Sequence, residues 1–460
     1  MRTQKQRLSF LLIFICCLQL LLPATQTEAA TKPKVSSHAY IIMDANTGNV
    51  LYSHNSTKKI YPASTVKLMT ALVVLDKCST KKKIHITKRM LKQVPSDAAA
   101  AGLRAGNSYT VSDLLHMLLL PSAGDAAVVL ACGSYGSVGK FVTAMNKKAK
   151  KLALNNTSFD NPIGLDIGNN YKKTYTTAKD FAKLARYTMT NSIIRSIVSK
   201  AKYTVSKAKY TKAFTIYNTN RFLSSVSYNH NLFQMIGGKT GTTRAAGSVL
   251  ITSAKDKNGH EIICAFFGNK SHAEMYSDIK KLLNYTFKQG KAGKLSWKKG
   301  FWDVRFRDSE KIIRNYYNKG KIPVSTRFYP TKKINQKKTL NLINRIAGTN
   351  FSALSATKSM TVLDFAKIYY AANMQTEAND KNEILSLQNT DSTVQNPTLE
   401  ELKDDCSAYK HIADCSEEEL QALAYLLATD ILPDSVSKDT SASITKEQAV
   451  LLADRIKKGQ

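Results

Sequence analysis

The sequence predicts an α/β domain of the α+β type over residues 31–290, followed by a mostly helical C-terminal region. Strand-like apolar runs occur at both ends of this segment, at 38–54 and 248–267, while residues 64–187 have helical spacing. We therefore expect one antiparallel sheet built from both ends of the domain, with helices inserted between them. The 460 residues allow two to three domains at about 150 residues each.

Each end of the domain has its own hairpin signal. Residues 38–54 are two apolar runs around Asn-Thr-Gly-Asn, and residues 248–267 are two runs around Asp-Lys-Asn-Gly. An Asn-Gly pair between apolar runs is a strong hairpin signal. An amphipathic pattern over residues 273–287 predicts a closing helix.

The central helices differ in how much they should be buried. Residues 66–75 are too apolar to face water, which predicts a buried helix. Residues 111–120, 126–132 and 141–154 predict three more helices, the last with a basic outer face.

The rest of the chain changes character twice. Residues 291–335 are basic and aromatic, and we interpret them as a short β-rich connector or a small β module. Residues 336–460 are helical in pattern. Within them Thr361 and Thr445 each follow a polar loop and precede an amphipathic helix, which is weak support for a repeat.

The net charge is +33 and is unevenly distributed. Residues 31–290 carry +26, residues 291–370 carry +14 and residues 371–460 carry −9, the first 30 residues adding +2. Such a chain favours polyanions, whether nucleic acid, acidic lipid or an anionic cell-wall polymer, unless the charge serves only solubility.

The first 30 residues predict export. Three basic residues precede an apolar run from Leu8 to Leu22, and small residues follow up to Ala30. This is the pattern of a secretory signal peptide, because the run is shorter than the roughly 20 residues of a membrane-spanning helix. An uncleaved anchor is the alternative. Export predicts an extracellular protein, or one associated with the cell wall or the membrane surface, and argues against nucleic acid as a partner.

Five cysteines follow residue 30, and their spacing is irregular. Cys78, Cys132, Cys264, Cys406 and Cys415 form neither a disulfide framework nor a metal-binding pattern, and only the last two are near enough in sequence to suggest a pair.

Three short motifs carry chemistry. They are Ser-Thr-Val-Lys at 64–67, Ser-Ala-Gly at 122–124 and Lys-Thr-Gly at 239–241, the only such triplet in the chain. A Ser and a Lys three residues apart share a helix face, and a buried Lys that loses its proton can act as a base. Lys239 would attract a carboxylate and would help to keep Lys67 neutral. A capped helix and a plain glycine turn are the structural alternatives.

With their flanking residues, at 62–72, 119–127 and 238–243, these motifs resemble those of the serine-type D-Ala-D-Ala carboxypeptidases. These are the low-molecular-mass penicillin-binding proteins of the penicillin-recognising serine enzymes. Weaker matches lie at 43–52, 156–166 and 175–180, and the resemblance spans about residues 38–288.

The resemblance implies an acyl-enzyme mechanism on peptidoglycan stem peptides, without a metal or another cofactor. Ser64 would attack the carbonyl between two D-alanines, Lys67 would take its proton, and Ser122 would relay a proton to the leaving D-Ala. β-Lactams would acylate the same serine.

The third motif would bind the substrate. The backbone N–H groups of Ser64 and Thr242 would form the oxyanion hole. Lys239 and Thr240, beside Gly241, would hold the terminal carboxylate.

One position departs from the family pattern, because Gly124 replaces the usual Asn of Ser-x-Asn. That amide would position Lys67 and the substrate. We therefore expect weaker turnover while Ser64 still acylates, and in the extreme a homologue that only binds wall peptides.

Two other functions have weaker support in the sequence. A class A β-lactamase needs a Glu to activate water, but the chain has none between Glu28 and Glu261, and Asp160 and Asp166 lie outside any such motif. Residues 409–414 and 444–449 are faintly similar to surface-layer-homology modules, which attach proteins to wall polymers. An ordinary helical appendage is the alternative.

Overall fold

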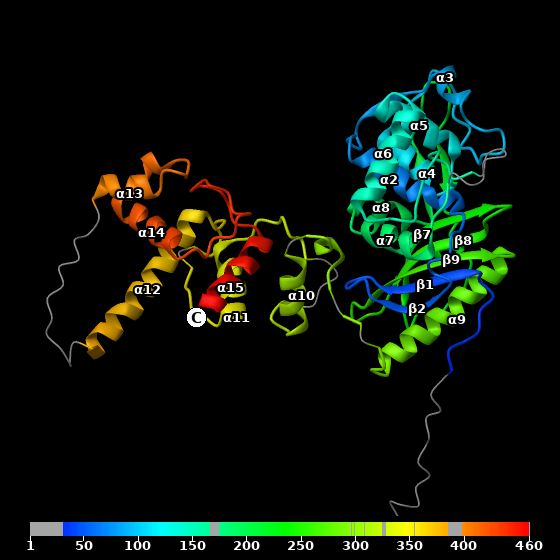
Figure 1. The fold of residues 1–460 in the computed structure, drawn as a ribbon. Coiled ribbons are helices and arrows are strands. Elements are labelled where there is room, and N and C mark those ends of the chain that lie inside the picture. Colours follow the sequence, from blue (N-terminus) through cyan, green and yellow to red (C-terminus); the bar gives the residue numbers. More distant parts are fainter. Residues whose placement is uncertain are drawn as a thin grey trace, which may run out of the picture. The chain divides into compact units, whose positions relative to one another are not determined.

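The computed structural model describes residues 31–165, 174–295, 297–298, 300–307, 309–323, 328–353, 355–384 and 398–459 (Figure 1). The predicted signal peptide and Asp166 lie outside these residues. The chain divides into two units, residues 1–35 and residues 36–460, and the following description concerns the second unit.

A five-stranded antiparallel sheet forms the framework of the N-terminal part. Its strand order is β2-β1-β9-β8-β7, so the first and last strands of the domain lie side by side. The strands are β1 (Ala39–Asp44), β2 (Val50–His54), β7 (Gln234–Thr243), β8 (Gly247–Lys255) and β9 (Glu261–Asn269). The predicted α+β fold, with its sheet closed by both ends of the segment, is confirmed.

The central strands β1, β9 and β8 of this sheet are buried on both faces. Alternate residues of β1, such as Ile41 and Met43, join the main hydrophobic core, while Tyr40 and Ile42 are buried on the opposite face. Figure 1 shows helix α9 (His272–Lys291) along one face and the other helices of the domain on the opposite side. The sheet is therefore a central layer.

The helices inserted between the strands match the predicted periodicity. The α-helices are α2 (Lys67–Leu75), α3 (Lys88–Leu91), α4 (Val111–Leu119), α5 (Gly124–Tyr135), α6 (Val138–Lys151), α7 (Ala178–Thr188) and α8 (Ser192–Val198). Helix α2 is buried from its first residue to Val74, as its composition predicts. The remaining elements are η1 (Ala63–Val66), η2 (Arg221–Leu223), β3 (Lys83–His85), β4 (Ser108–Thr110), β5 (Lys202–Val205) and β6 (Phe214–Tyr217).

A second hydrophobic core is formed by residues 301–456. Its elements are η3 (Trp302–Val304), α10 (Glu310–Asn318), α11 (Gln336–Ala347), α12 (Val362–Ile384), α13 (Leu399–Asp405), η4 (Ile412–Asp414), α14 (Glu417–Ala428) and α15 (Lys446–Gly459). The predicted helical character of residues 336–460 is confirmed for the described part.

The β-rich character expected of residues 291–335 is wrong for the described part of that segment, which contains η3, α10 and isolated bridges in place of strands. Its aromatic residues serve the second core instead, because Phe301, Tyr316, Tyr317 and Phe328 are all buried there. Aromatic enrichment reports burial as well as strand propensity.

Three helix starts in this second core are joined in a ring. The bridges are Lys333 with Thr445, Asn335 with Ser359, and Thr361 with Ser443. The loops of the two suspected copies thus meet, and a third helix start, capped by Asn335, joins them. Each cap residue accepts a hydrogen bond from a backbone N–H of its own helix, which stabilises the first turn.

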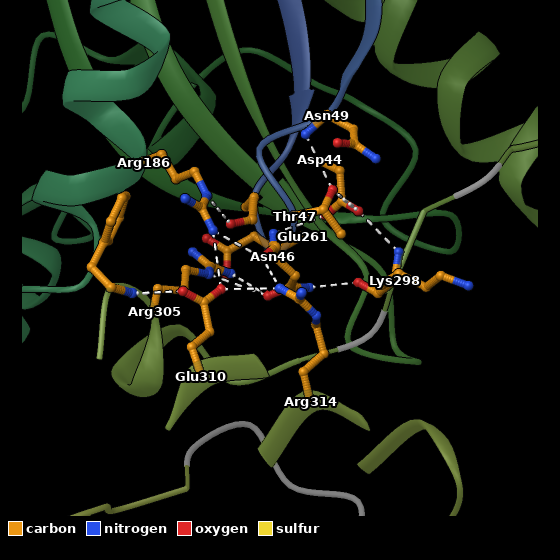
Figure 2. A network of polar contacts seen from close by, with 12 residues as sticks. Asp44, Asn46, Thr47, Asn49, Arg186, Glu261, Lys298, Arg305, Glu310 and Arg314 are labelled. Carbon is orange, nitrogen blue, oxygen red and sulfur yellow. Dashed lines mark hydrogen bonds and ion pairs between the residues drawn. The ribbon is translucent and has the colours of Figure 1, made fainter. Parts of the chain in front are cut away.

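A buried polar network connects the sheet to the segment before α10 (Figure 2). Glu261, at the start of β9, accepts hydrogen bonds from Arg195 at 2.9 and 3.1 Å and from Arg305 at 2.9 Å. Burial alone would raise the pKa of Glu261, but the two guanidinium groups hold it well below its usual range. The Glu261 carboxylate thus connects both α8, through Arg195, and the segment before α10, through Arg305, to the sheet.

The turn between β1 and β2 completes the network (Figure 2). Asn46 accepts a hydrogen bond from Arg305 at 2.9 Å and donates one to the Lys298 carbonyl at 2.7 Å. Arg186 bridges the Ala45 carbonyl, at 2.7 Å, and Glu310, at 3.1 Å. Each buried guanidinium of the network is thus paired with a carboxylate, as a buried charge requires, although Arg305 Nη1 has no hydrogen-bond partner among the described residues.

All five cysteines beyond residue 30 are free thiols. Cys406 and Cys415 are therefore not paired, and Cys406 is a buried core residue.

Candidate active site

Ser64 and Lys67 meet at the start of the buried helix α2. Ser64 lies in the η1 turn and Lys67 is the first residue of α2, so their side chains share one face. Lys67 Nζ donates hydrogen bonds to Ser64 Oγ and to the Ile163 carbonyl, both at 2.8 Å. A hydroxyl within hydrogen-bond reach of an amine is the geometry of an activated nucleophile.

The environment of Lys67 favours its neutral form. Its side chain is 1% exposed, and burial lowers its pKa well below the ordinary lysine value. The positive charge of Lys239 lowers this pKa further, while Asp125 acts in the opposite direction. An amine without its proton can accept one from Ser64.

Two backbone segments pack closely against the turn that contains Ser64. Ala63 has φ of +47°, an unusual conformation that turns the chain just before the nucleophile. A Cβ on Gly164 would lie 2.0 Å from the Ala63 carbonyl oxygen, and one on Gly241 would lie 3.0 Å from the Ser64 nitrogen. Glycine at both positions lets two other segments pack against this turn.

Ser122 lies in the turn between α4 and α5, with φ of +70°. Its side chain is buried, and its Oγ has no hydrogen-bond partner within the described residues. A buried hydroxyl without a partner in the protein is available for a hydrogen bond to a ligand.

The third motif lies on edge strand β7, beside Ser64. Lys239 is buried, and its Nζ donates a hydrogen bond to the Thr240 carbonyl at 2.9 Å. Burial lowers the pKa of Lys239 to about 7. Thr240 Oγ1 pairs with Thr219 Oγ1 at 2.5 Å. Thr242 Oγ1 pairs with His272 Nε2 at 2.9 Å.

These elements enclose a cleft of about 420 Å³. Of the predicted site residues, Ser64, Ser122, Thr240, Gly241 and Thr242 line it directly. Lys67 and Lys239 do not, because both are buried beneath its floor. The structure therefore brings all three motifs together around one opening.

Six further residues complete the lining: Ala99, Pro121, Thr219, Arg221, His272 and Tyr276. Arg221 and His272 come from the η2 turn and the start of α9, and sequence reasoning did not identify them. Neither lies in a recognisable motif. Only the position of Arg221 shortly before strand β7 was a possible signal.

Gly124 is closely surrounded. Its N–H donates to the Ala99 carbonyl at 2.6 Å, and a Cβ added here would lie 2.9 Å from Ala98 Cβ. The loop before Gly106 thus occupies space beside this position. An asparagine would have to displace it.

A buried carboxylate fixes that loop. Asp125 accepts hydrogen bonds from the backbone N–H groups of Ala101 and Leu103 at 3.0 Å.

A second segment positions Lys67, because Ile163 supplies the carbonyl that accepts a hydrogen bond from it. Asn161 Oδ1 in turn accepts hydrogen bonds from the Ile163 and Gly164 N–H groups at 3.0 and 2.6 Å. Lys67 is therefore positioned by a backbone carbonyl that Asn161 orients.

Asp160, one of the two possible stand-ins for a β-lactamase base, does not line the cleft. It accepts hydrogen bonds from Asn161 and Thr174. The other, Asp166, lies outside the described residues.

Comparison with known proteins agrees with this geometry. The family model described as D-alanyl-D-alanine carboxypeptidase matches residues 26–271. The chain is 32% identical over 293 residues to the D-alanyl-D-alanine carboxypeptidase DacF of Bacillus subtilis, covering 62% of this chain and 72% of that protein. It is 34% identical to the D-alanyl-D-alanine carboxypeptidase of Streptomyces sp. K15, covering 58% and 92%.

Solved structures show the same fold. The Streptomyces K15 DD-transpeptidase matches with a TM-score of 0.51 at 33% identity, covering 56% of this chain and 99% of that one. A D-alanyl-D-alanine carboxypeptidase from Mycobacterium tuberculosis matches with a TM-score of 0.50 at 26% identity, covering 57% and 95%. With its three motifs around one cleft, this chain belongs to the D-alanyl-D-alanine carboxypeptidase family of serine peptidases.

Proposed function

We propose that the protein removes the terminal D-alanine from peptidoglycan stem peptides through an acyl-enzyme on Ser64. The observation that carries this proposal is the 2.8 Å hydrogen bond between Lys67 Nζ and Ser64 Oγ at the floor of the cleft. It combines with the family membership, which gives a serine D-Ala-D-Ala carboxypeptidase.

The proposed reaction has two stages. Lys67 takes the Ser64 proton as Oγ attacks the carbonyl between the two D-alanines, and the developing oxyanion is held by the N–H groups of Ser64 and Thr242. The C–N bond then breaks, and Ser122 passes a proton to the leaving amine. Water hydrolyses the Ser64 ester and frees the enzyme.

Three groups are suited to the terminal carboxylate. Thr240 lines the cleft, whereas Lys239 lies beneath it and acts through its charge. Arg221 is the one permanently charged cation among the described lining residues.

Intact-mass measurement of residues 31–460 tests the proposal directly. We expect a mass increase equal to one penicillin on the wild-type protein, and release of D-Ala from a D-Ala-D-Ala peptide. Ser64→Ala should do neither, since the nucleophile is gone. A wild-type protein that stays unmodified and releases no D-Ala would refute the proposal.

The pH dependence of acylation tests the electrostatic effect of Lys239 on Lys67. Because the charge of Lys239 lowers the pKa of Lys67, Lys239→Gln should raise that pKa and move the acid limb of penicillin acylation to higher pH. Penicillin acylation rates measured across the pH range give the position of this limb. Lys81→Gln, which changes an exposed lysine outside the cleft, is the control. If the acid limb of Lys239→Gln stays at the wild-type pH, Lys239 does not lower the pKa of Lys67.

Gly124 is proposed to limit turnover. Gly124→Asn alone should slow acylation, because its Cβ would clash with Ala98. Gly124→Asn with Ala98→Gly should relieve the clash and raise D-Ala release above wild type by about tenfold, the effect of one added hydrogen bond of about 1.4 kcal/mol. Ala98→Gly alone is the control. If the double variant is no faster than wild type, Gly124 is not the limit.

We also propose that the protein is exported and retained at the cell wall. The signal-like residues 1–30 and the +40 carried by residues 31–370 (26 + 14) support this, as does the faint surface-layer-homology similarity. In the described part of the chain, no single helix has both the length and the apolarity to cross a bilayer; α5 and α6 meet that test only as a bent pair.

Retention by charge should depend on salt. We expect the full chain to sediment with isolated cell walls at low ionic strength and to be released near 1 M salt, where the screening length falls to about 3 Å. No sedimentation at low salt would contradict retention by charge.

A further inference from the structure

A second cavity, of about 810 Å³, lies away from the catalytic cleft. The sheet contributes Gln234 at the start of β7 and Lys255 at the end of β8, while Trp302 of η3 and Tyr317 of α10 line it from the following segment. None of its lining residues lines the catalytic cleft.

The cavity adjoins the buried polar network of Figure 2 at Glu261, which belongs to both. Arg195 and Glu261 both line it and form an ion pair at 2.9 Å, and Arg305 holds the other oxygen of Glu261. The Arg195 guanidinium also lies 4.9 Å from the Trp302 ring centre, which orients the indole. Its walls are therefore formed in advance of any ligand.

One buried polar group in the cavity wall lacks a partner. The Tyr317 hydroxyl has no hydrogen-bond partner among the described residues, although the side chain is only 5% exposed. Its neighbour Tyr316, in the same helix, donates to Asp454 at 2.8 Å. A buried hydroxyl normally has a partner, so a ligand group is expected beside Tyr317.

The wall combines compensated charges with polar and aromatic surface. Arg195 and Glu261 neutralise each other, and Asp256 pairs with His260 at 2.8 Å, while Lys255 and Lys257 add positive charge. Aromatic surface and amide groups, as at Asn231 and Gln234, make up much of the rest. Aromatic rings take the C–H faces of sugars, while planar polar side chains take their hydroxyl and acetamido groups.

We propose that this cavity binds a short segment of N-acetylated glycan, the sugar strand that carries the stem peptides. This inference rests on the proposed function. Gln234 in the cavity and Thr240 in the cleft lie on the same strand, six residues apart, which is about 20 Å at about 3.3 Å per residue. An extended peptide of about six residues covers that distance, so a bound glycan can present its own peptide to Ser64.

Tryptophan fluorescence tests the proposal on the full chain carrying Ser64→Ala. The chain has two tryptophans, and Trp297→Phe leaves Trp302 as the sole reporter. Chitotetraose should change its emission saturably, and cellotetraose, which lacks acetamido groups, should bind more weakly. Tyr317→Phe should weaken chitotetraose binding about 3- to 10-fold, the effect of one hydrogen bond. Tyr316→Phe should leave it unchanged.

Activity separates this site from the catalytic one. With Ser64 intact, Tyr317→Phe should raise KM for glycan-linked peptides and leave D-Ala release from a free D-Ala-D-Ala peptide unchanged. Absence of saturable chitotetraose binding, or equal binding by Tyr317→Phe, would overturn the proposal even in an active enzyme. Failure of Ser64 acylation would refute the proposed function instead. The chitotetraose measurement would then still show whether the cavity binds glycan.

Discussion

The approach of strand β7 to the η1 turn is the constraint on which the site depends. Gly241 lies against the Ser64 backbone, and Gly164 lies against Ala63 from another segment. A methyl group at Gly241 would push the Lys-Thr-Gly strand away from Ser64, and one at Gly164 would push its segment away from Ala63. Beside Ser64, the sheet thus meets the helical part at a contact from which side chains are excluded, and the cleft opens next to this contact.

Burying two lysines beneath that cleft is unfavourable for folding unless both lose much of their charge. Lys67 and Lys239 are each 1% exposed, and burial lowers the pKa of both. The backbone carbonyls of Ile163 and Thr240 satisfy their hydrogen bonds without restoring the charge. The same desolvation that makes the site unfavourable for stability favours the neutral form of Lys67, which can accept a proton in the proposed reaction.

Local patterns in the sequence predicted the sheet, the buried helix α2 and the three motifs, because each depends on neighbouring residues. They could not predict Arg221 or His272, which reach the cleft only through the packing of η2 and α9. Residues 291–335 were misjudged because aromatic side chains suit a strand and a helical core equally well. The closeness of Ala98 to Gly124 likewise depends on tertiary contacts, so the sequence showed the substitution without its steric cause.

The ring of helix starts in the second core has a consequence for the order of folding. Two of its three bridges, those of Lys333 and Thr361, are made to residues 443–445. Residues 333–361 therefore cannot complete their native pairing until residues 443–445 have been synthesised. The catalytic sheet, by contrast, has all five of its strands once β9 has been synthesised.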